Sequence, residues 1–134
     1  MEEWRTIAES SNYMVSNLGR IKRCAHKTIM RNRFGECVAN YSEKILRTHK
    51  TNKGYVGLAL FINGKYINFL VHRLVAKAFL PNLQNYPCIN HKDEDRANNA
   101  VSNLEWCSYQ YNNTYGNRID KMRQTNMVKR LWKK

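Results

Sequence analysis

The sequence predicts an α+β protein in which a β-rich N-terminal arm and a hairpin precede a strand–loop–strand–helix unit and a basic C-terminal helix. Three observations predict this class. Two β-rich runs, residues 55–61 and 66–71, flank Asn63-Gly64, the dipeptide most typical of a tight hairpin. Apolar residues then recur at helical spacing. Two short strand-like runs, residues 88–91 and 103–107, finally precede a residue suited to begin a helix.

Charge is unevenly distributed along the chain. Lys and Arg number 23 against ten Asp and Glu, a net charge of +13. Residues 19–53 carry ten basic and two acidic side chains (+8), residues 117–134 seven and one (+6), and residues 91–116 two and four (−2). Two basic segments favour binding of a polyanion, because each neutralised phosphate releases condensed counterions. A generic basic surface, as in a ribosomal protein or a membrane-surface binder, is the alternative.

The first fifty residues predict an irregular β ribbon and a long arm. Strand-like pieces at residues 13–15 and 20–22 flank residues 16–19, where an Asn and a Gly favour a turn. Residues 24–50 are highly charged and show little periodicity, so we expect a long loop or arm that orders fully only on DNA. We therefore place a basic DNA-binding arm at residues 1–53.

A helix is expected directly after the hairpin. It begins at His72 and ends before Pro81. Its apolar face is formed by Leu74, Val75, Ala78 and Phe79. Phe79 is expected in the core, as is Trp106 further along the chain.

The strand–loop–strand–helix unit follows. A polar loop over residues 92–102 separates its two strands, and Ser108 is a plausible N-cap for a helix that starts at Tyr109 and breaks near Gly116. A last helix is expected over about residues 118–132. These elements place a core at residues 54–116 and a basic helical tail at residues 117–134.

Cysteine spacing and the N-terminus bear on compartment. The four cysteines include no C-x-x-C pair, and at least twelve residues separate each from the next, which argues against zinc knuckles and a disulfide framework. No apolar run approaches the ~20 residues of a membrane span, and residues 1–5 are no signal stretch. We expect reduced cysteines and a cytoplasmic protein.

The chemistry is expected at Asn90, His91 and Asn112. Hydrolysis of a phosphodiester needs a base for water, and a His supplies one because its ordinary pKa of ~6.5 lies near working pH. Two oxygen-donor side chains can hold Mg²⁺, which takes its other ligands from water and phosphate. Neighbouring strand residues point in opposite directions, so Asn90 and His91 can serve metal and water separately. A strand end with a satisfied histidine is the alternative.

Three blocks of sequence carry a resemblance to a known family. Residues 89–93, Asn98-Asn99, residues 103–106 and Asn112 resemble the HNH nucleases of the ββα-metal (His-Me finger) superfamily. Residues 71–81 resemble the upstream part of its phage and intron homing-endonuclease branch. Trp4 with residues 13–21 looks like the DNA-binding module that precedes that HNH domain. The resemblance covers roughly residues 4–23 and 54–113.

The resemblance implies roles for residues of the finger. His91 matches the general base that activates water. Asn90 stands where relatives have Asp or Asn as the first metal ligand, and Asn112 matches the second. Asn103 resembles the residue that braces the finger's loop. Because both ligands are uncharged amides, we expect metal and DNA to bind cooperatively, with the oxygens of Asn90 and Asn112 facing each other.

Other positions have less specific expectations. His72 is expected to support the finger, and Arg73 to contact DNA phosphate. Asn98-Asn99 fits loop turn chemistry better than catalysis, and Asn113 is a rival to Asn112. Backbone contacts to DNA are also expected from the tail and from Arg20, Lys22 and Arg23.

The resemblance therefore implies an HNH endonuclease that hydrolyses double-stranded DNA with one divalent metal ion, Mg²⁺ or Mn²⁺. One active site per chain makes a nick in one strand the expected product. A monomer is the default, in the cytoplasm of a bacterial or phage-infected host cell. The alternatives are a catalytically inactive DNA-binding protein that keeps the HNH fold, and a structural RNA-binding protein.

Overall fold

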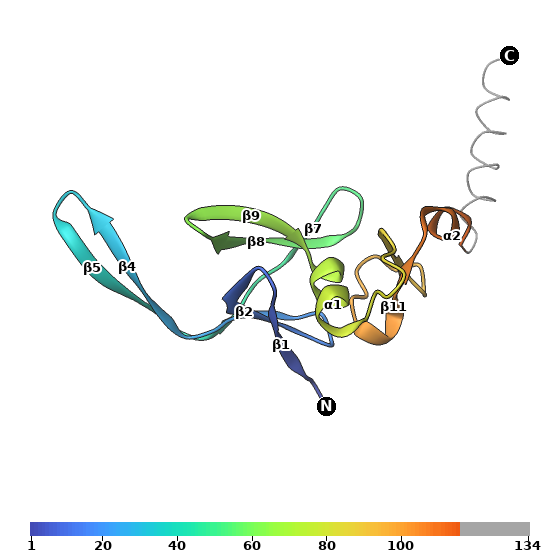
Figure 1. Ribbon diagram of the computed structural model, residues 1–134, viewed down its shortest axis with the longest axis horizontal. Coiled ribbons are helices and arrows are strands. Elements are labelled where there is room, and N and C mark those ends of the chain that lie inside the picture. The colour runs from blue at the N-terminus through green and yellow to red at the C-terminus, as the bar shows by residue number, and fades with distance from the viewer. Residues whose placement is uncertain (116–134) are drawn as a thin grey trace, which may run out of the picture.

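The computed structural model describes residues 1–115 (Figure 1). The helix expected over residues 118–132 and the tail at residues 117–134 lie outside the described residues. Within them a β-hairpin projects at one end, and a short helix lies toward the opposite end (Figure 1). Strands dominate and two helices complete the fold, so the α+β class is confirmed.

The N-terminal sheet has four antiparallel strands in the order β1-β2-β3-β6. They are β1 (Trp4–Ile7), β2 (Ser10–Ser16), β3 (Ile21–Arg23) and β6 (Lys44–Ile45). The ribbon expected around residues 13–22 is confirmed by β2 and β3. Gly19 lies in their turn at φ +89°, a conformation that L side chains rarely adopt.

The prediction of a long loop or arm over residues 24–50 was wrong in expecting little regular structure there. Strands β4 (His26–Asn32) and β5 (Gly35–Tyr41) pair in register as a hairpin, the projecting element of Figure 1. At its tip the Phe34 N–H donates to Asn32 Oδ1 at 2.8 Å. Both faces of the ribbon are largely exposed, so it lacks the apolar alternation that marks a half-buried strand.

The predicted hairpin of residues 55–71 is confirmed. Strands β8 (Val56–Ile62) and β9 (Lys65–Leu70) are joined by Asn63 at φ +53° and Gly64 at φ +79°. Two positive φ values suit a two-residue hairpin turn. A short strand, β7 (His49–Lys50), extends this sheet. Helix α1 (Val71–Phe79) follows without a break, within a residue of its predicted start.

The strand–loop–strand–helix unit is also confirmed. Strands β10 (Cys88–His91) and β11 (Leu104–Cys107) pair antiparallel, with a 3₁₀ turn, η1 (Val101–Asn103), before β11. Helix α2 (Tyr109–Thr114) follows, and its N-cap Ser108 Oγ accepts a hydrogen bond from Tyr111 N at 3.2 Å. We refer to residues 88–115 as the finger.

One core joins these parts around α1. The N-terminal sheet, the β8–β9 hairpin, α1 and the finger all contribute buried apolar residues, among them Val15, Ile21, Leu58, Leu60, Val71, Leu74, Val75, Ile89 and Leu104. Phe79 and Trp106 pack against this core, as expected. The four cysteines are free thiols. No helix among residues 1–115 is long and apolar enough to span a membrane.

Candidate active site

His91 lies at the end of β10 and is buried, with 6% of its surface exposed. Its Nε2 is 3.0 Å from Asn99 Oδ1. An amide oxygen only accepts hydrogen bonds, so Nε2–H donates and Nδ1 keeps its lone pair. The ring also lies 5.1 Å from the His72 ring and 6.2 Å from the Tyr55 ring, centroid to centroid. His91 is therefore held in one orientation and one tautomer.

Asn99 is itself fixed by the N-terminal sheet. It is 5% exposed, and the turn between β2 and β3 packs on it. A Cβ placed on Gly19 would lie 2.9 Å from Asn99 Cβ. Two residues on, the Val101 N–H donates to Asn17 O at 2.8 Å. The N-terminal module thus supports the residue that holds His91.

Asn90 is buried beside β11, where it is paired directly opposite Glu105. Its Nδ2 donates to Glu105 Oε1 at 2.8 Å. A carboxylate accepts only, so the nitrogen of the amide faces Glu105 and Oδ1 is left for another partner. Asn90 thus offers an amide oxygen at the end of the strand.

Asn112 lies on α2, which contacts β10. It is half-buried whereas Asn113 is exposed, so Asn112 is the amide that the helix turns inward. Beyond the helix, Tyr115 Oη donates to Lys92 O at 2.7 Å and ties the chain to the loop.

The donor set suits a hard divalent cation. Among residues 1–115 no group of three or more His, Cys, Asp or Glu side chains could hold a metal ion. Amide oxygens of Asn90 and Asn112 would therefore be completed by water and phosphate, an arrangement that Mg²⁺ accepts and thiophilic metals do not favour.

Asn103 braces the loop between β10 and β11. Its Nδ2 donates to Asp93 Oδ1 and Asn98 O, both at 2.9 Å, and its Oδ1 accepts from Asp93 N at 3.0 Å. Asn98 Nδ2 also donates to Asp93 Oδ2 at 2.8 Å. The hydrogen bond from Asn98, then that from the Asp95 backbone, lowers the pKa of Asp93 against the opposing effect of burial. Asn98 therefore belongs to the loop's turn chemistry.

His72 lies on α1, where its buried ring packs against the rings of His91 and Tyr55. Burial, followed by repulsion from His91 and Arg73, lowers its pKa to about 4. Among the described residues its Nδ1 has no hydrogen-bond partner. His72 is therefore a neutral ring that packs against the candidate base.

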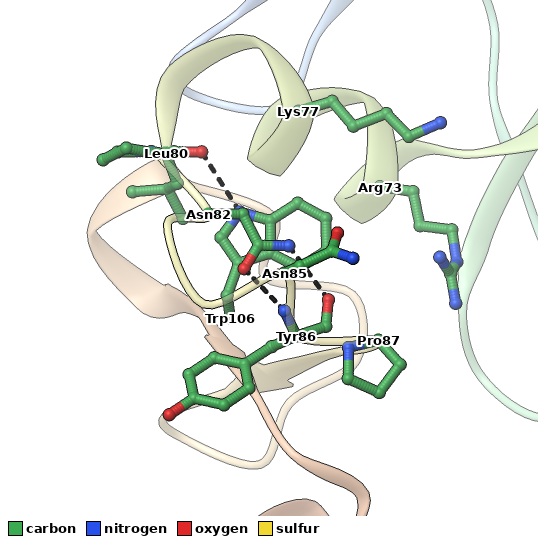
Figure 2. Close-up of a pocket in the computed structure, with 9 residues that line it drawn as sticks. Arg73, Lys77, Leu80, Asn82, Asn85, Tyr86, Pro87 and Trp106 are labelled. Atoms are coloured by element: carbon green, nitrogen blue, oxygen red, sulfur yellow. Dashed lines mark hydrogen bonds between the residues drawn. The ribbon is translucent and has the colours of Figure 1, made fainter.

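Arg73, next to it, is exposed and lines a shallow pocket of about 510 Å³ (Figure 2). Lys77 lines the same side from α1, and Trp106 lies across from it, with its Nε1–H donating to Leu80 O at 3.1 Å. Asn90 and His91 are not among the residues that line this pocket.

The other three cations expected to contact DNA make contacts within the chain. Arg20 forms a bidentate ion pair with Glu2. Lys22 Nζ lies 2.9 Å from Glu43 Oε1. Arg23 donates to the carbonyl of Ser42.

Sequence reasoning missed three residues of this site: Asn99, Glu105 and Tyr55. Asn99 was grouped with Asn98 as turn chemistry, and only Asn98 fits that description. Strand pairing offered a signal for Glu105, since an antiparallel register that pairs residue 89 with residue 106 sets Glu105 opposite Asn90. No local pattern singles out Tyr55.

Comparison with known proteins agrees with this geometry. Residues 2–61 match the NUMOD4 motif and residues 69–114 match the HNH endonuclease family. The chain is 32% identical over 132 residues to an uncharacterized HNH endonuclease, L245, of Acanthamoeba polyphaga mimivirus, covering 98% of this chain and 33% of that one. It is 32% identical over 111 residues to DNA endonuclease I-HmuI of Bacillus phage SP01, covering 82% of this chain and 55% of that one.

A solved structure is also similar. That structure, of DNA binding and cleavage by the HNH homing endonuclease I-HmuI, matches with a TM-score of 0.66 and 27% identity over 96% of this chain and 68% of that one. The chain spans about a third to about half of the length of the two curated relatives. Residues 69–114 form an HNH endonuclease domain, and a NUMOD4 motif at residues 2–61 precedes it.

Proposed function

We propose that the protein is a metal-dependent endonuclease that nicks one strand of double-stranded DNA. The observation that carries the proposal is the buried His91, whose Nε2–H donates to Asn99 while its Nδ1 remains a proton acceptor. The match of residues 69–114 to the HNH endonuclease family supports the same function.

His91 acts as the general base. Its Nδ1 takes a proton from a water molecule, and the oxygen of that water attacks the phosphorus as the bond to the 3′ oxygen breaks. The departing 3′ oxygen takes a proton from solvent water, so the products carry 5′-phosphate and 3′-hydroxyl ends. The hydrogen bond to Asn99 stabilises the imidazolium that forms and keeps the ring aimed at the water.

One divalent metal ion, Mg²⁺ or Mn²⁺, would be held by Asn90 and Asn112. When bound, it stabilises the negative charge that develops on the phosphate and on the departing oxygen. Asn103 and His72 are proposed to support the finger, through the braced loop and through packing on His91.

DNA binding is proposed for the basic arm at residues 1–53. A two-stranded ribbon such as β4–β5 fits the width of a major groove. The ribbon carries the exposed side chains of Lys27, Arg31 and Arg33, with the aromatic ring of Phe34 at the tip. The solved relative, the HNH homing endonuclease I-HmuI, binds and cleaves DNA, which supports the same partner.

Backbone contacts are also proposed for Arg73 and for Arg20, Lys22 and Arg23. The last three would exchange their contacts within the chain for phosphate. We further propose that the core spans residues 54–116, that the basic tail at residues 117–134 adds to DNA binding, and that the protein acts as a monomer in the cytoplasm of a bacterial or phage-infected cell.

The alternative is a catalytically inactive DNA-binding protein, favoured by the uncharged pair of metal ligands. Supercoiled plasmid incubated with Mg²⁺ or Mn²⁺ separates the two. An endonuclease converts it to the open-circular form only when metal is present. An inactive relative retards the plasmid in a gel and leaves it supercoiled in every metal.

A further inference from the structure

Glu105 contacts Asn90, a proposed metal ligand, but takes no part in the chemical step proposed for His91. We propose that Glu105 is a positioning residue of the metal site, which turns the oxygen of Asn90 toward the cation and adds the negative charge that the two amide ligands lack. This inference rests on the proposed function.

Strand pairing places Glu105 where this role requires it. Asn90 on β10 and Glu105 on β11 are direct partners in the antiparallel pair, so their side chains share one face. Asn90 Nδ2 donates to Glu105 Oε1 at 2.8 Å. The two ends of an amide have similar shapes, but only the nitrogen can donate to a carboxylate. Glu105 therefore selects the flip of Asn90 that leaves Oδ1 free.

The helix that carries the second ligand lies beside this pair. Helix α2 contacts β10, and Asn112 is the amide that it turns inward. Asn90, Glu105 and Asn112 thus lie on three neighbouring elements, β10, β11 and α2.

The charge of Glu105 distinguishes it from a neutral brace. Asn90 and Asn112 contribute no formal charge to a cation. Asp93, another carboxylate of the finger, is occupied by hydrogen bonds from Asn98 and Asn103. Glu105 is half-buried, so water screens its field less than at the surface. Partners one step behind a metal ligand commonly change metal affinity by about 10–100-fold.

Two substitutions separate orientation from charge. In Glu105→Gln the side-chain oxygen still accepts from Asn90 while the charge is lost. Glu105→Leu removes both. Glu3→Gln, at an exposed carboxylate next to β1, is the matched control for net charge. Mn²⁺ binding is measured by calorimetry on the full chain, with and without a short DNA duplex, after thermal unfolding has shown that each variant folds.

We expect Glu105→Gln to weaken Mn²⁺ binding by about tenfold, Glu105→Leu to weaken it further, and Glu3→Gln to leave it unchanged. In NMR spectra of metal-free protein, the Asn90 side-chain NH₂ signals, identified by their loss in Asn90→Asp, should move in Glu105→Leu much more than in Glu105→Gln. The Mn²⁺ concentration that gives half-maximal nicking should rise in Glu105→Gln and rise further in Glu105→Leu.

Wild-type Mn²⁺ affinity in both Glu105 variants would overturn the inference. Variants that lose stability and activity to the same extent, with metal affinity unchanged, would also overturn it. If the parent protein nicks DNA and both Glu105 variants need the same concentration of metal as the parent, only the proposed role of Glu105 is contradicted. A parent that neither binds Mn²⁺ nor nicks contradicts the proposed function as well.

Discussion

Gly19 and Asn99, eighty residues apart in sequence, are packed so closely that a Cβ on the first would lie 2.9 Å from the Cβ of the second. Gly19 belongs to the N-terminal module and Asn99 to the finger, where it accepts the hydrogen bond from His91. The contact therefore joins the two family modules at the candidate base. A substitution in the N-terminal turn should therefore lower the rate of catalysis.

Gly19→Ala tests this coupling, with Gly64→Ala as its matched control. Both glycines have positive φ, but only Gly19 would also meet a neighbour. We expect each alanine to cost roughly 1–2 kcal/mol in the free energy of unfolding from backbone strain. Only Gly19→Ala should also lower the nicking rate, because Asn99 must shift. Urea unfolding and single-turnover nicking measure the two effects, and equal nicking by both variants would contradict the coupling.

Asn99 should matter more for catalysis than Asn98 although the two are neighbours. Asn99→Ala removes the acceptor for His91 Nε2–H, so we expect a loss of about 10–100-fold in nicking, less than the ~10²–10⁴-fold expected from loss of the base itself. Asn98→Ala should act mainly on stability, because Asn98 bonds to Asp93 in the loop. Nicking rates at saturating metal and DNA decide this. Identical losses in the two variants would remove Asn99 from the site.

Stability should fall in mild acid because of His72. Its pKa is about 4 in the folded protein and 6.5 in the unfolded chain. Between these values the unfolded state binds a proton that the folded state does not. The free energy of unfolding should therefore decrease as pH falls from 6.5 toward 4, by up to about 3 kcal/mol.

Urea unfolding at pH 7.0 and pH 5.0 measures this dependence. His72→Leu should flatten it, whereas His49→Gln, at an exposed histidine, should not. A His72→Leu variant with the full acid sensitivity of the parent would show that other groups are responsible.

Thiol reactivity should follow burial. Burial, then the neighbouring Cys88 and Glu105, raises the pKa of Cys107 to about 11, whereas Cys37 is exposed on the β4–β5 ribbon. The thiolate is the reactive form, so Cys37 should be alkylated first and Cys107 only on unfolding. Mass spectrometry after timed iodoacetamide treatment follows each site, and early labelling of Cys107 would contradict the packing of β11.

Affinity for DNA should depend strongly on salt. With roughly six to ten phosphate contacts, binding is expected to weaken by ~10³–10⁵ between 50 and 200 mM salt. Replacing Lys27 and Arg33 together with Ala should make the slope shallower by about 2 if each meets a phosphate, whereas Lys77→Ala, at a lysine paired with Glu9, serves as control. An unchanged slope would exclude the β4–β5 ribbon from the interface.

Sequence predicted the elements whose local chemistry is strong. Asn63-Gly64 fixed one hairpin, Ser108 the start of α2, and the helical period the position of α1. It failed for the β4–β5 ribbon, since a strand exposed on both faces shows no apolar alternation. The short strands β1 and β6 were also missed, because they depend on pairing with partners distant in sequence.

The residues of the candidate site likewise fall into those that the sequence could predict and those that it could not. His91, Asn90 and Asn112 could be chosen because chemistry and family pattern both point to them. Asn99 and Glu105 could not, since their contacts depend on how the loop and the second strand fold back on β10. Neither Asn99 nor Glu105 can be recognised as a site residue from its neighbours in sequence alone.

The most direct measurement of the central claim is single-turnover plasmid nicking by His91→Ala beside the parent, with DNA affinity measured in parallel. We expect the variant to nick at least ~10²-fold more slowly, the usual scale for loss of a general base, while binding DNA as tightly as the parent. His72→Leu is the control, because His72 is neutral and packs only behind the candidate base. A His91→Ala variant that nicks at the parental rate would contradict the account and make His72 the candidate.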